Sequence, residues 1–285
     1  MIEYIKTVIL AILTGTTAPL PVSSAAHFSF LANVIGVQGG TEIAALYYNG
    51  FLVAFSLVVI ISFRKIFIGC LKSAFVSKKD KVKYESHKGH RFIFKNIGLS
   101  LIPTVLLFVP VSKGKLLIDF FNGFLGKDKL LLSGFACIIT ALILVVALWY
   151  SRNKTNREES SGPKAAFRLS LYQLPCYIIP GFSHVASGAV NLIICDAKEK
   201  TFIRELYVYL APSMLIVGIV QLIRTVASGL LFDPVTLVLG MVVFGVVTKL
   251  VISSVLRTNI RRLFGFFCIY SILYGMFIAV ASFLI

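Results

Sequence analysis

The stretch Ala18-Pro19-Leu20-Pro21-Val22-Ser23-Ser24 interrupts an apolar segment that runs from residue 2 to residue 36. Proline removes a backbone donor and clashes with the preceding helical turn, so a helix must break here. The segment 168–196 is interrupted in the same way, near Pro175 and Pro180-Gly181. Irregular backbone at membrane depth survives only where protein or a watery cavity satisfies its polar groups. Both segments are therefore predicted to be re-entrant helical hairpins that line a cavity.

The composition around these hairpins excludes a soluble protein. Of the 285 residues, 58% are hydrophobic and 14% are charged, whereas a soluble domain carries about a quarter charged residues. The prolines also argue against a cleaved signal peptide at the N-terminus. The predicted fold class is an all-α polytopic membrane protein with six transmembrane helices and two re-entrant hairpins. The six spans, each with about 20 apolar residues, are 41–63, 92–111, 130–150, 202–224, 232–256 and 263–285.

A short repeat relates the two hairpins. Pro21-Val22-Ser23-Ser24 and Pro180-Gly181-Phe182-Ser183 share the pattern P-x-x-S at a separation of 159 residues, and each lies at a predicted hairpin tip. Three spans follow each hairpin, which predicts an inverted-topology repeat with a binding site near the midplane. The first repeat covers 1–150 with its hairpin at 1–40, 151–167 is the linker, and the second repeat covers 168–285 with its hairpin at 168–196.

Loop charges give the orientation in the membrane. The net charge is +16, and the stretch from Arg64 to Lys95 holds ten Lys or Arg against Asp80 and Glu85, so it is predicted to be cytoplasmic. Alternation then places both termini outside, together with the loops 112–129 and 225–231; the loops 151–168 and 257–262 lie inside. Because the basic residues sit in short stretches between apolar runs, we expect contacts with anionic membrane lipids and none with nucleic acid.

The hairpin tips carry a family resemblance. Leu20-Pro21-Val22-Ser23-Ser24-Ala25-Ala26-His27 resembles the signature L-P-[IV]-S-S-x-x-H of the undecaprenyl-diphosphatase family, the bacitracin-resistance type of membrane lipid phosphatase. Pro180-Gly181-Phe182-Ser183 resembles that family's second signature, P-G-x-S-R-S-G. The segment from Arg204 to Pro212 and the position of Lys249 are also similar to the family pattern, so the resemblance covers essentially the whole chain.

The resemblance implies a function and a location. Members of the family are multi-pass proteins of the bacterial plasma membrane. They remove the terminal phosphate from the C55 polyprenyl diphosphate and so return the monophosphate carrier lipid to cell-wall peptidoglycan synthesis. The implied partner is a polyprenyl phosphate or diphosphate, and a homodimer is left open. Phosphoanhydride cleavage of this kind depends on positioning and charge stabilisation more than on covalent chemistry by the protein.

The same comparison assigns roles to residues of the tips. It gives catalytic roles to Ser24, His27, Ser183 and His184. Phosphate contacts are expected from Ser23, Ser24, Gly181, Ser183 and Ser187, since serine hydroxyls and backbone N–H groups at a helix N-terminus bind phosphate. The alternative for the serines is a helix cap, and for His27 a hydrogen-bonded structural role. Further candidates for the cavity are Thr14, Thr17, Gln173 and Lys249; the alternatives are threonines bonded back to their own helix and a lysine snorkelling to the interface.

The charged half of the family's site is missing from this chain. The two family glutamates align with Thr14 and Ala18, the arginine aligns with His184, and a later Tyr-Arg pair appears as Tyr270-Ser271. A Mg²⁺ or Ca²⁺ cofactor is implied by the resemblance, but such cations prefer carboxylate oxygens, so no metal ligands are assigned. Two functions stay open: a diverged phosphatase, and a polyprenyl-phosphate binding protein or transporter that does not hydrolyse.

The cysteines and the remaining histidines add no site. Five cysteines are scattered without paired or metal-type spacing, and they are interpreted as small apolar side chains. His87 and His90 form an H-x-x-H pattern inside the basic loop, where solvated polar side chains are expected.

Overall fold

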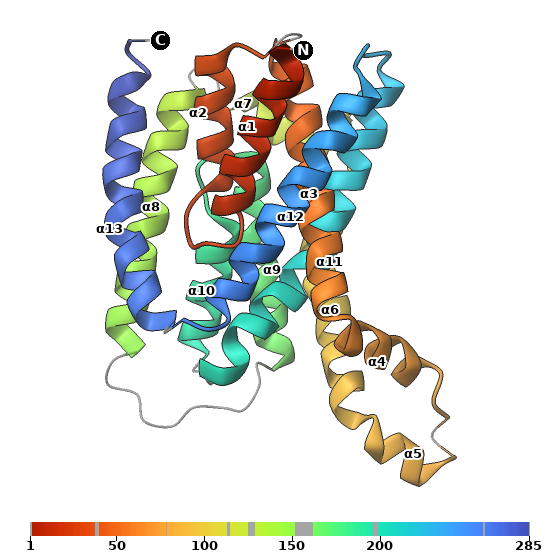
Figure 1. Cartoon of the computed structure of the whole chain (residues 1–285). Helices are drawn as coiled ribbons and strands as arrows, with labels where there is room; N and C mark the ends of the chain where they lie inside the picture. The colour runs from red at the N-terminus through yellow and green to blue at the C-terminus, as the bar shows by residue number, and fades with distance from the viewer. Residues whose placement is uncertain are drawn as a thin grey trace.

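The computed structural model describes residues 2–37, 40–77, 79–112, 115–124, 129–151, 162–195, 199–258 and 260–284. These residues form a bundle of helices with one two-stranded antiparallel β-hairpin (Figure 1). Both chain ends lie at one end of the bundle, and an arm of short helices projects from the other. The elements are α1 (Ile2–Thr17), α2 (Ser24–Ile35), α3 (Gly40–Ser62), α4 (Arg64–Ala74), α5 (Lys81–Ser86), α6 (Lys88–Leu106), β1 (Pro110–Ser112), β2 (Lys115–Leu116), α7 (Leu117–Phe124), α8 (Lys129–Tyr150), α9 (Pro163–Ile178), α10 (His184–Ile194), α11 (Glu199–Ala227), α12 (Pro234–Val255) and α13 (Ile260–Ala281).

Five of these helices are long and apolar enough to cross a membrane. They are α3, α8, α11, α12 and α13, and they coincide with five of the six predicted spans. Many of their large apolar side chains face outward, as lipid-exposed side chains do. The chain is therefore an all-α polytopic membrane protein.

The sixth predicted span, 92–111, is not among those five helices. The corresponding helix α6 begins earlier, at Lys88, and ends at Leu106, beyond which the chain turns into β1. Its first turns carry Lys88, Arg91 and Lys95, which lower its apolar character. The predicted boundary at 111 is wrong because Pro110, which lacks a backbone donor, starts a strand.

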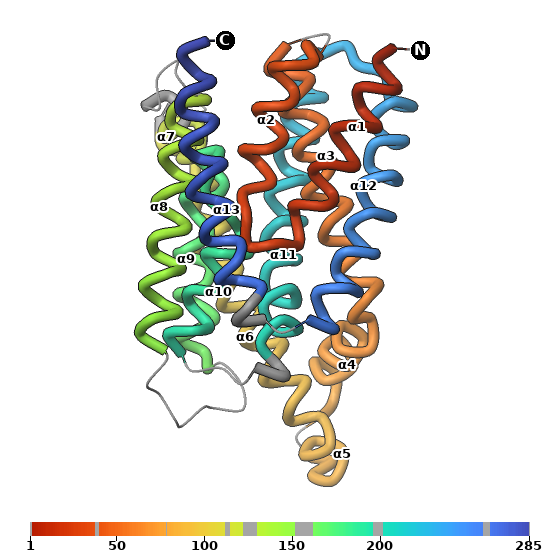
Figure 2. Tube along the Cα trace, turned by 60° about the vertical axis from the view of Figure 1, so that its left-hand side comes forward, coloured from red at the N-terminus to blue at the C-terminus, as the bar shows by residue number. Residues whose placement is uncertain are grey.

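Two pairs of helices form hairpins that do not cross the bundle. α2 has 12 residues and α10 has 11, which correspond to about 18 Å and 16 Å of helix against the roughly 30 Å of a bilayer core. Figure 2 shows the turn between α1 and α2 at mid-height of the bundle. The ends of α9 and α10 that are away from their own turn lie toward the end of the bundle opposite the two chain termini. At the far end of α2 the chain leaves through Gly36, whose φ of 61° is left-handed and ends the helix.

The second hairpin breaks at Pro180 to Ser183, the tip that the sequence predicts, and the helix is not interrupted at Pro175. Pro175 lies inside α9, which continues to Ile178, and residues 179–183 join it to α10. Pro175 leaves only the carbonyl oxygen of Leu171, four residues earlier, without its helical donor, and the helix continues for one more turn because Ile179 N–H donates to Pro175 O at 2.8 Å. Of the predicted linker 151–167, residues 152–161 lie outside the described residues.

Small residues let the helices approach closely. A Cβ on Gly134 of α8 would lie 2.7 Å from the carbonyl oxygen of Gly275 on α13, and the reverse contact is equally short. Gly15 of α1 meets Phe244 of α12 in the same way, and Thr248 donates to Gly15 O at 3.2 Å. Such contacts replace the hydrophobic driving force that is lacking between helices in lipid.

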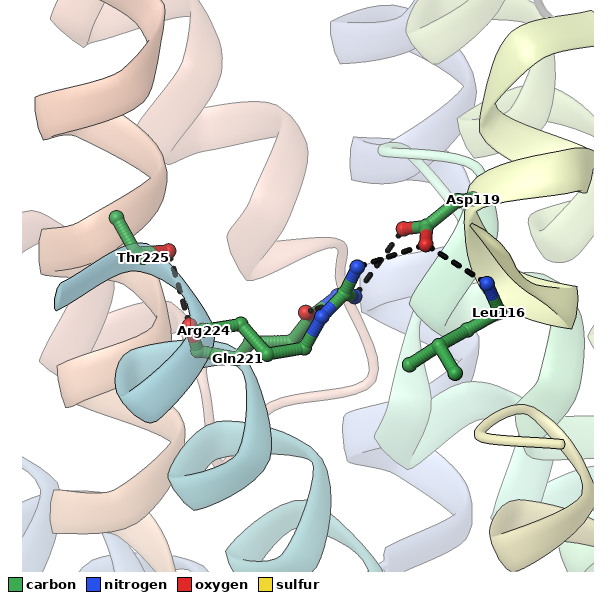
Figure 3. A network of polar contacts seen from close by, with 5 residues as sticks. All are labelled: Leu116, Asp119, Gln221, Arg224 and Thr225. Carbon is green, nitrogen blue, oxygen red and sulfur yellow. Dashed lines mark hydrogen bonds and ion pairs between the residues drawn. The ribbon is translucent and has the colours of Figure 1, made fainter. Parts of the chain in front are cut away.

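A bidentate ion pair joins two elements at the end of the bundle near the termini. Arg224 of α11 donates from Nη1 to Asp119 Oδ1 at 3.1 Å and from Nη2 to Oδ2 at 2.7 Å (Figure 3). Leu116 N–H also donates to Asp119 Oδ2, at 3.0 Å. Partial desolvation alone would raise the pKa of Asp119, but the hydrogen bonds from Arg224 and Leu116 hold it below its usual value. The pair fixes α7 against α11.

Candidate functional site

Two serines cap the inner helices of the hairpins. Ser23 Oγ accepts from Ala26 N–H at 3.1 Å and begins α2, and Ser183 Oγ accepts from Ala186 N–H at 3.1 Å and begins α10. In the P-x-x-S alignment Ser24, not Ser23, is opposite Ser183. The structural equivalence is therefore shifted by one residue, because the loop after Pro180 is one residue longer than the loop after Pro21.

The caps direct two positive helix ends toward the tips. Each cap satisfies one N–H of its helix, and the other first-turn N–H groups remain as donors. The tip loops themselves, 18–23 and 179–183, contain no charged residue. Any anion held here would be bound by helix dipoles, N–H groups and hydroxyls.

His27 is buried in α2 with both ring nitrogens hydrogen-bonded. Nδ1 lies 2.6 Å from the carbonyl oxygen of Ser23, and Nε2 lies 2.7 Å from the hydroxyl of Tyr270 on α13. A carbonyl oxygen only accepts, so Nδ1 carries the proton and Nε2 of the neutral ring accepts from Tyr270. The ring also stacks on Tyr274, with centroids 3.9 Å apart. His27 is thus an oriented base whose lone pair is occupied by a tyrosine.

His184, the first residue of α10, is fixed by Gln173 of α9. Gln173 Nε2 donates to the backbone oxygen of His184 at 2.9 Å, and Gln173 Oε1 lies 2.6 Å from His184 Nδ1. Because the backbone oxygen must face the amide donor, Oε1 faces Nδ1, which therefore carries the proton. The remaining nitrogen, Nε2, has no hydrogen-bond partner among the described residues although the side chain is only 5% exposed. It is a buried base with a free lone pair.

A cavity of about 490 Å³ opens between α2, α3, α8 and α9. Tyr48 of α3 and Cys176 of α9 line it and contact the predicted serines: Tyr48 Oη lies 3.5 Å from Ser24 Oγ, and Cys176 Sγ lies 3.4 Å from Ser187 Oγ. None of the predicted site residues is among the described residues that line this cavity. The other polar side chains at its wall are Ser29, Asn33, Thr41 and Tyr177.

Ser24, Ser187 and His184 thus contact side chains that line the cavity. His184 packs on the ring of Tyr177 with centroids 4.6 Å apart, and the Tyr177 hydroxyl donates to Ser213 Oγ at 2.9 Å. Ser23 interacts with the thiol of Cys137 on α8. The contacts of Ser24 with Tyr48 and of His184 with Tyr177 place the first turns of α2 and α10 next to the cavity wall.

Four other predicted candidates lie in different settings. Thr14 and Thr17 donate back to Leu10 O at 2.6 Å and Leu13 O at 3.0 Å, the arrangement expected of a structural role. Lys249 is exposed and donates to Ser62 Oγ at 2.9 Å. Ser62 is the last residue of α3, and both residues are far from the hairpin tips in the sequence. Gly181 has a φ of 123° and packs on Ser133 of α8 so closely that a Cβ would collide with its carbonyl oxygen.

Buried tyrosines are the contacts that the sequence analysis missed. Tyr207 of α11 donates to Pro19 O at 2.7 Å and so holds the first tip. Tyr48, Tyr177 and Tyr274 contact a hairpin serine or histidine as described above. A signal existed, since hydroxyl-bearing rings in the middle of a span need a partner. The only carboxylate buried among the described residues, that of Glu205, also lies on α11.

The donor set does not fit a hard divalent cation. Over the described residues, no group of three or more His, Cys, Asp or Glu side chains comes together in a way that could hold a metal ion. Serine hydroxyls, neutral imidazoles and an amide remain at the tips, and Mg²⁺ and Ca²⁺ prefer carboxylate oxygens. We therefore derive no step through a metal.

Comparison with known proteins extends over most of the chain. A family model described as bacitracin resistance protein BacA matches residues 7–277. The undecaprenyl-diphosphatase of Korarchaeum cryptofilum is 25% identical over 270 residues, which cover 94% of this chain and 96% of that protein. Undecaprenyl-diphosphatase 2 of Bacillus thuringiensis is 24% identical over 272 residues, covering 93% and 94%. The undecaprenyl-diphosphatase of Oceanobacillus iheyensis is 26% identical over 209 residues, covering 72% and 69%.

These matches confirm the resemblance that the hairpin motifs indicate. The family model covers far more than half of the sequence and spans both hairpin tips, and the relative from Korarchaeum cryptofilum covers 94% of the chain. The chain belongs to the family of the bacitracin resistance protein BacA.

Proposed function

We propose that this protein removes the terminal phosphate of a polyprenyl diphosphate, the C55 lipid in the bacterial plasma membrane, and releases the monophosphate carrier. The observation that carries the proposal is the family match over residues 7–277. It is supported by a buried, oriented histidine base, His27, near the start of α2, a helix whose positive end faces the hairpin tip. Helix N-termini suit phosphate, and a fixed imidazole suits proton transfer.

The chemistry assigned to the chain is general-base hydrolysis. Water attacks the terminal phosphorus and passes its proton to His27 Nε2 once the Tyr270 hydroxyl turns away. The bond from that phosphorus to the bridging oxygen breaks, and the two products are inorganic phosphate and the polyprenyl monophosphate. The Ser23 carbonyl at 2.6 Å from Nδ1 holds the imidazolium that forms. First-turn N–H groups of α2 and α10, with Ser24, stabilise the charge on the phosphate oxygens.

We also infer that the fold is an inverted-topology repeat with the boundaries 1–150 and 168–285. The helix contacts support this: α1 packs on α12 as α9 packs on α6, and α3 packs on α12 as α11 packs on α6. α3 packs on α11 and α8 on α13, as helices related by a pseudo-twofold axis do. The two hairpins would then enter from opposite faces, with both termini outside. Labelling of single cysteines from each side of the membrane tests this; outside labelling of Lys81→Cys would contradict it.

A carrier that binds the lipid phosphate without hydrolysing it is the second candidate. The observation that favours it is the uncharged donor set at the tips, together with the Gln173–His184 pair in place of charged groups. Loss of a preorganised charge-stabilising donor costs about 10²- to 10³-fold in rate. Loss of two such donors would slow hydrolysis strongly while the lipid phosphate could still bind.

One experiment separates the two functions. The purified protein in lipid nanodiscs is incubated with C55 diphosphate, with Mg²⁺, with Ca²⁺ and with EDTA, and phosphate release and lipid binding are measured in parallel. Release by the wild type that is lost in His27→Gln and kept in Ser253→Ala supports the phosphatase. Binding of the C55 monophosphate without release under every condition overturns it and establishes the carrier.

A further inference from the structure

A helix outside the bundle displays an apolar stripe to its surroundings. In α4 the exposed large apolar side chains are Ile68, Leu71 and the residue that ends the helix, Phe75, which is 88% exposed. Their spacing of three and four residues places them on one face. Cys70 and Ser73 on the other face are buried. Solvent exposure of such a stripe is unfavourable, so it indicates a surface that meets another apolar phase.

The stripe is held rigidly by contacts with α6. Arg91 donates from Nη2 to Ser73 O at 3.2 Å and to Val76 O at 3.3 Å, and its guanidinium lies 3.6 Å from the centre of the Tyr84 ring. Cys70 Sγ donates to His90 O at 3.4 Å, and the His90 ring packs directly on Gly69. The helix is therefore a folded, oriented element and not a loose loop.

Cations flank the stripe. Arg64, Lys65 and Lys72 are exposed on α4 itself. Within 64–95 there are ten Lys or Arg and two acidic residues, and one of the two, Glu85, is paired with Lys88 at 3.4 Å. An apolar stripe with flanking cations is the pattern of a helix that lies in a membrane interface.

The position of α4 fits a membrane surface. α4 begins two residues after α3 ends, and α3 is one of the five helices able to span the bilayer. Figure 1 shows α4 turning sideways out of the bundle beneath α3, at the end opposite the two termini. The helix therefore starts where the hydrocarbon core ends.

We propose that α4 docks on the anionic headgroup surface of the cytoplasmic leaflet, with Ile68, Leu71 and Phe75 at the boundary of headgroups and acyl chains. Arg64, Lys65 and Lys72 pair with lipid phosphates. A second copy of the chain fits this surface less well than a membrane does. Docking of two such arms would bring together two segments with ten cations each, which repel one another. The inference concerns membrane anchoring of the arm, rests on the proposed topology and does not depend on hydrolysis.

Tryptophan fluorescence of the full-length protein in nanodiscs tests the docking. The natural tryptophan is removed by Trp149→Phe, and Phe75→Trp supplies the probe. In nanodiscs of phosphatidylglycerol we expect blue-shifted emission that brominated acyl chains quench; in phosphatidylcholine the quenching should fall at least twofold. Charge reversal by Lys65→Glu with Lys72→Glu should lower the quenching in phosphatidylglycerol by a similar factor.

Matched controls decide between the outcomes. Val82→Trp on α5 replaces a side chain that is 85% exposed but lies off the stripe, and it should emit as in water without quenching. Emission from the Phe75→Trp probe that is water-like in both lipids overturns the proposal, as does equal quenching in both. Energy transfer between labelled copies without lipid quenching also overturns it, in favour of self-association. Phosphate release by the same samples is measured separately, so failure of the docking and failure of the enzyme function stay distinguishable.

Discussion

His27 Nε2 lies 2.7 Å from the hydroxyl of Tyr270, although 243 residues separate the two in the chain. The contact links the first hairpin to the last helix, and it occupies the lone pair that hydrolysis would need. His184 presents the opposite case, because its Nε2 has no partner among the described residues. The two histidines have the same protonated nitrogen, Nδ1, but they differ in whether the basic nitrogen is satisfied. The first three predictions follow from this difference in hydrogen bonding.

Replacing His27 should abolish hydrolysis while the protein stays folded. His27→Gln keeps a polar side chain of similar reach but removes the base, so phosphate release should fall by about 10²- to 10⁴-fold. Release from C55 diphosphate and the midpoint of thermal unfolding are measured on the same preparation. Ser253→Ala, at a half-buried serine on α12 that donates to Lys249 O, is the control and should match the wild type. Unchanged release in His27→Gln would remove His27 from the mechanism.

Tyr270→Phe should remove the hydrogen bond to His27 while it keeps the aromatic ring in place. The variant keeps the ring but leaves Nε2 of His27 buried without its donor, so the free energy of unfolding should fall by about 1–3 kcal/mol. Hydrolysis should persist, since the base becomes free. Thermal unfolding and phosphate release check both parts. A loss of hydrolysis equal to that of His27→Gln would instead make Tyr270 a catalytic residue.

The Gln173–His184 pair should behave as a coupled unit. His184→Arg alone places an unpaired cation in a buried site and should cost several kcal/mol, on the order of 3–5. Adding Gln173→Glu supplies an adjacent carboxylate and should recover at least half of that loss. The test is a double-mutant cycle of unfolding free energies. Simple additivity of the two changes would contradict direct pairing at these positions.

Gly181 should tolerate no side chain. Its φ of 123° and its contact with Ser133 leave no room for a Cβ, so Gly181→Ala should lower the free energy of unfolding by more than about 1 kcal/mol. Gly98→Ala on α6 is the matched control, because nothing lies within 4 Å of the added Cβ and its φ is not left-handed. That variant should be neutral or slightly stabilising. Equal unfolding midpoints for the two variants would argue against a tight second tip.

The Asp119–Arg224 pair should give a small, acid-sensitive stabilisation. Because the pKa of Asp119 is lowered in the folded protein, the stabilisation is fully present above the unfolded value near 4 and is lost as the pH falls through the folded value. Both side chains are partly exposed, so the pair should contribute no more than about 1 kcal/mol. Hydrogen exchange of residues 116–121 should be faster in Asp119→Asn than in the wild type at pH 7, and the difference should vanish in acid. A difference that is independent of pH would exclude the carboxylate as its cause.

The sequence by itself determined the membrane location and the two breaks in otherwise apolar segments. Both follow from local chemistry: about 20 apolar residues need a bilayer, and proline and glycine end helices wherever the chain goes next. Motif residues such as Pro21 and Ser23 likewise lie at a tip because capping is local. The helix end predicted at residue 111 is wrong for a related reason, because Pro110 shows that the helix stops before it but not how many residues before.

Only the tertiary structure decided which side chains meet. The partners of His27 and His184, the tyrosine that holds Pro19 and the cavity wall at Tyr48 come from helices far apart in the chain. Apolar periodicity shows that a helix is buried but not against which neighbour or at what height, because many helix pairings bury the same surface. Close approach at glycines such as Gly134 and Gly275 selects one pairing, and that choice sets which polar groups face each other.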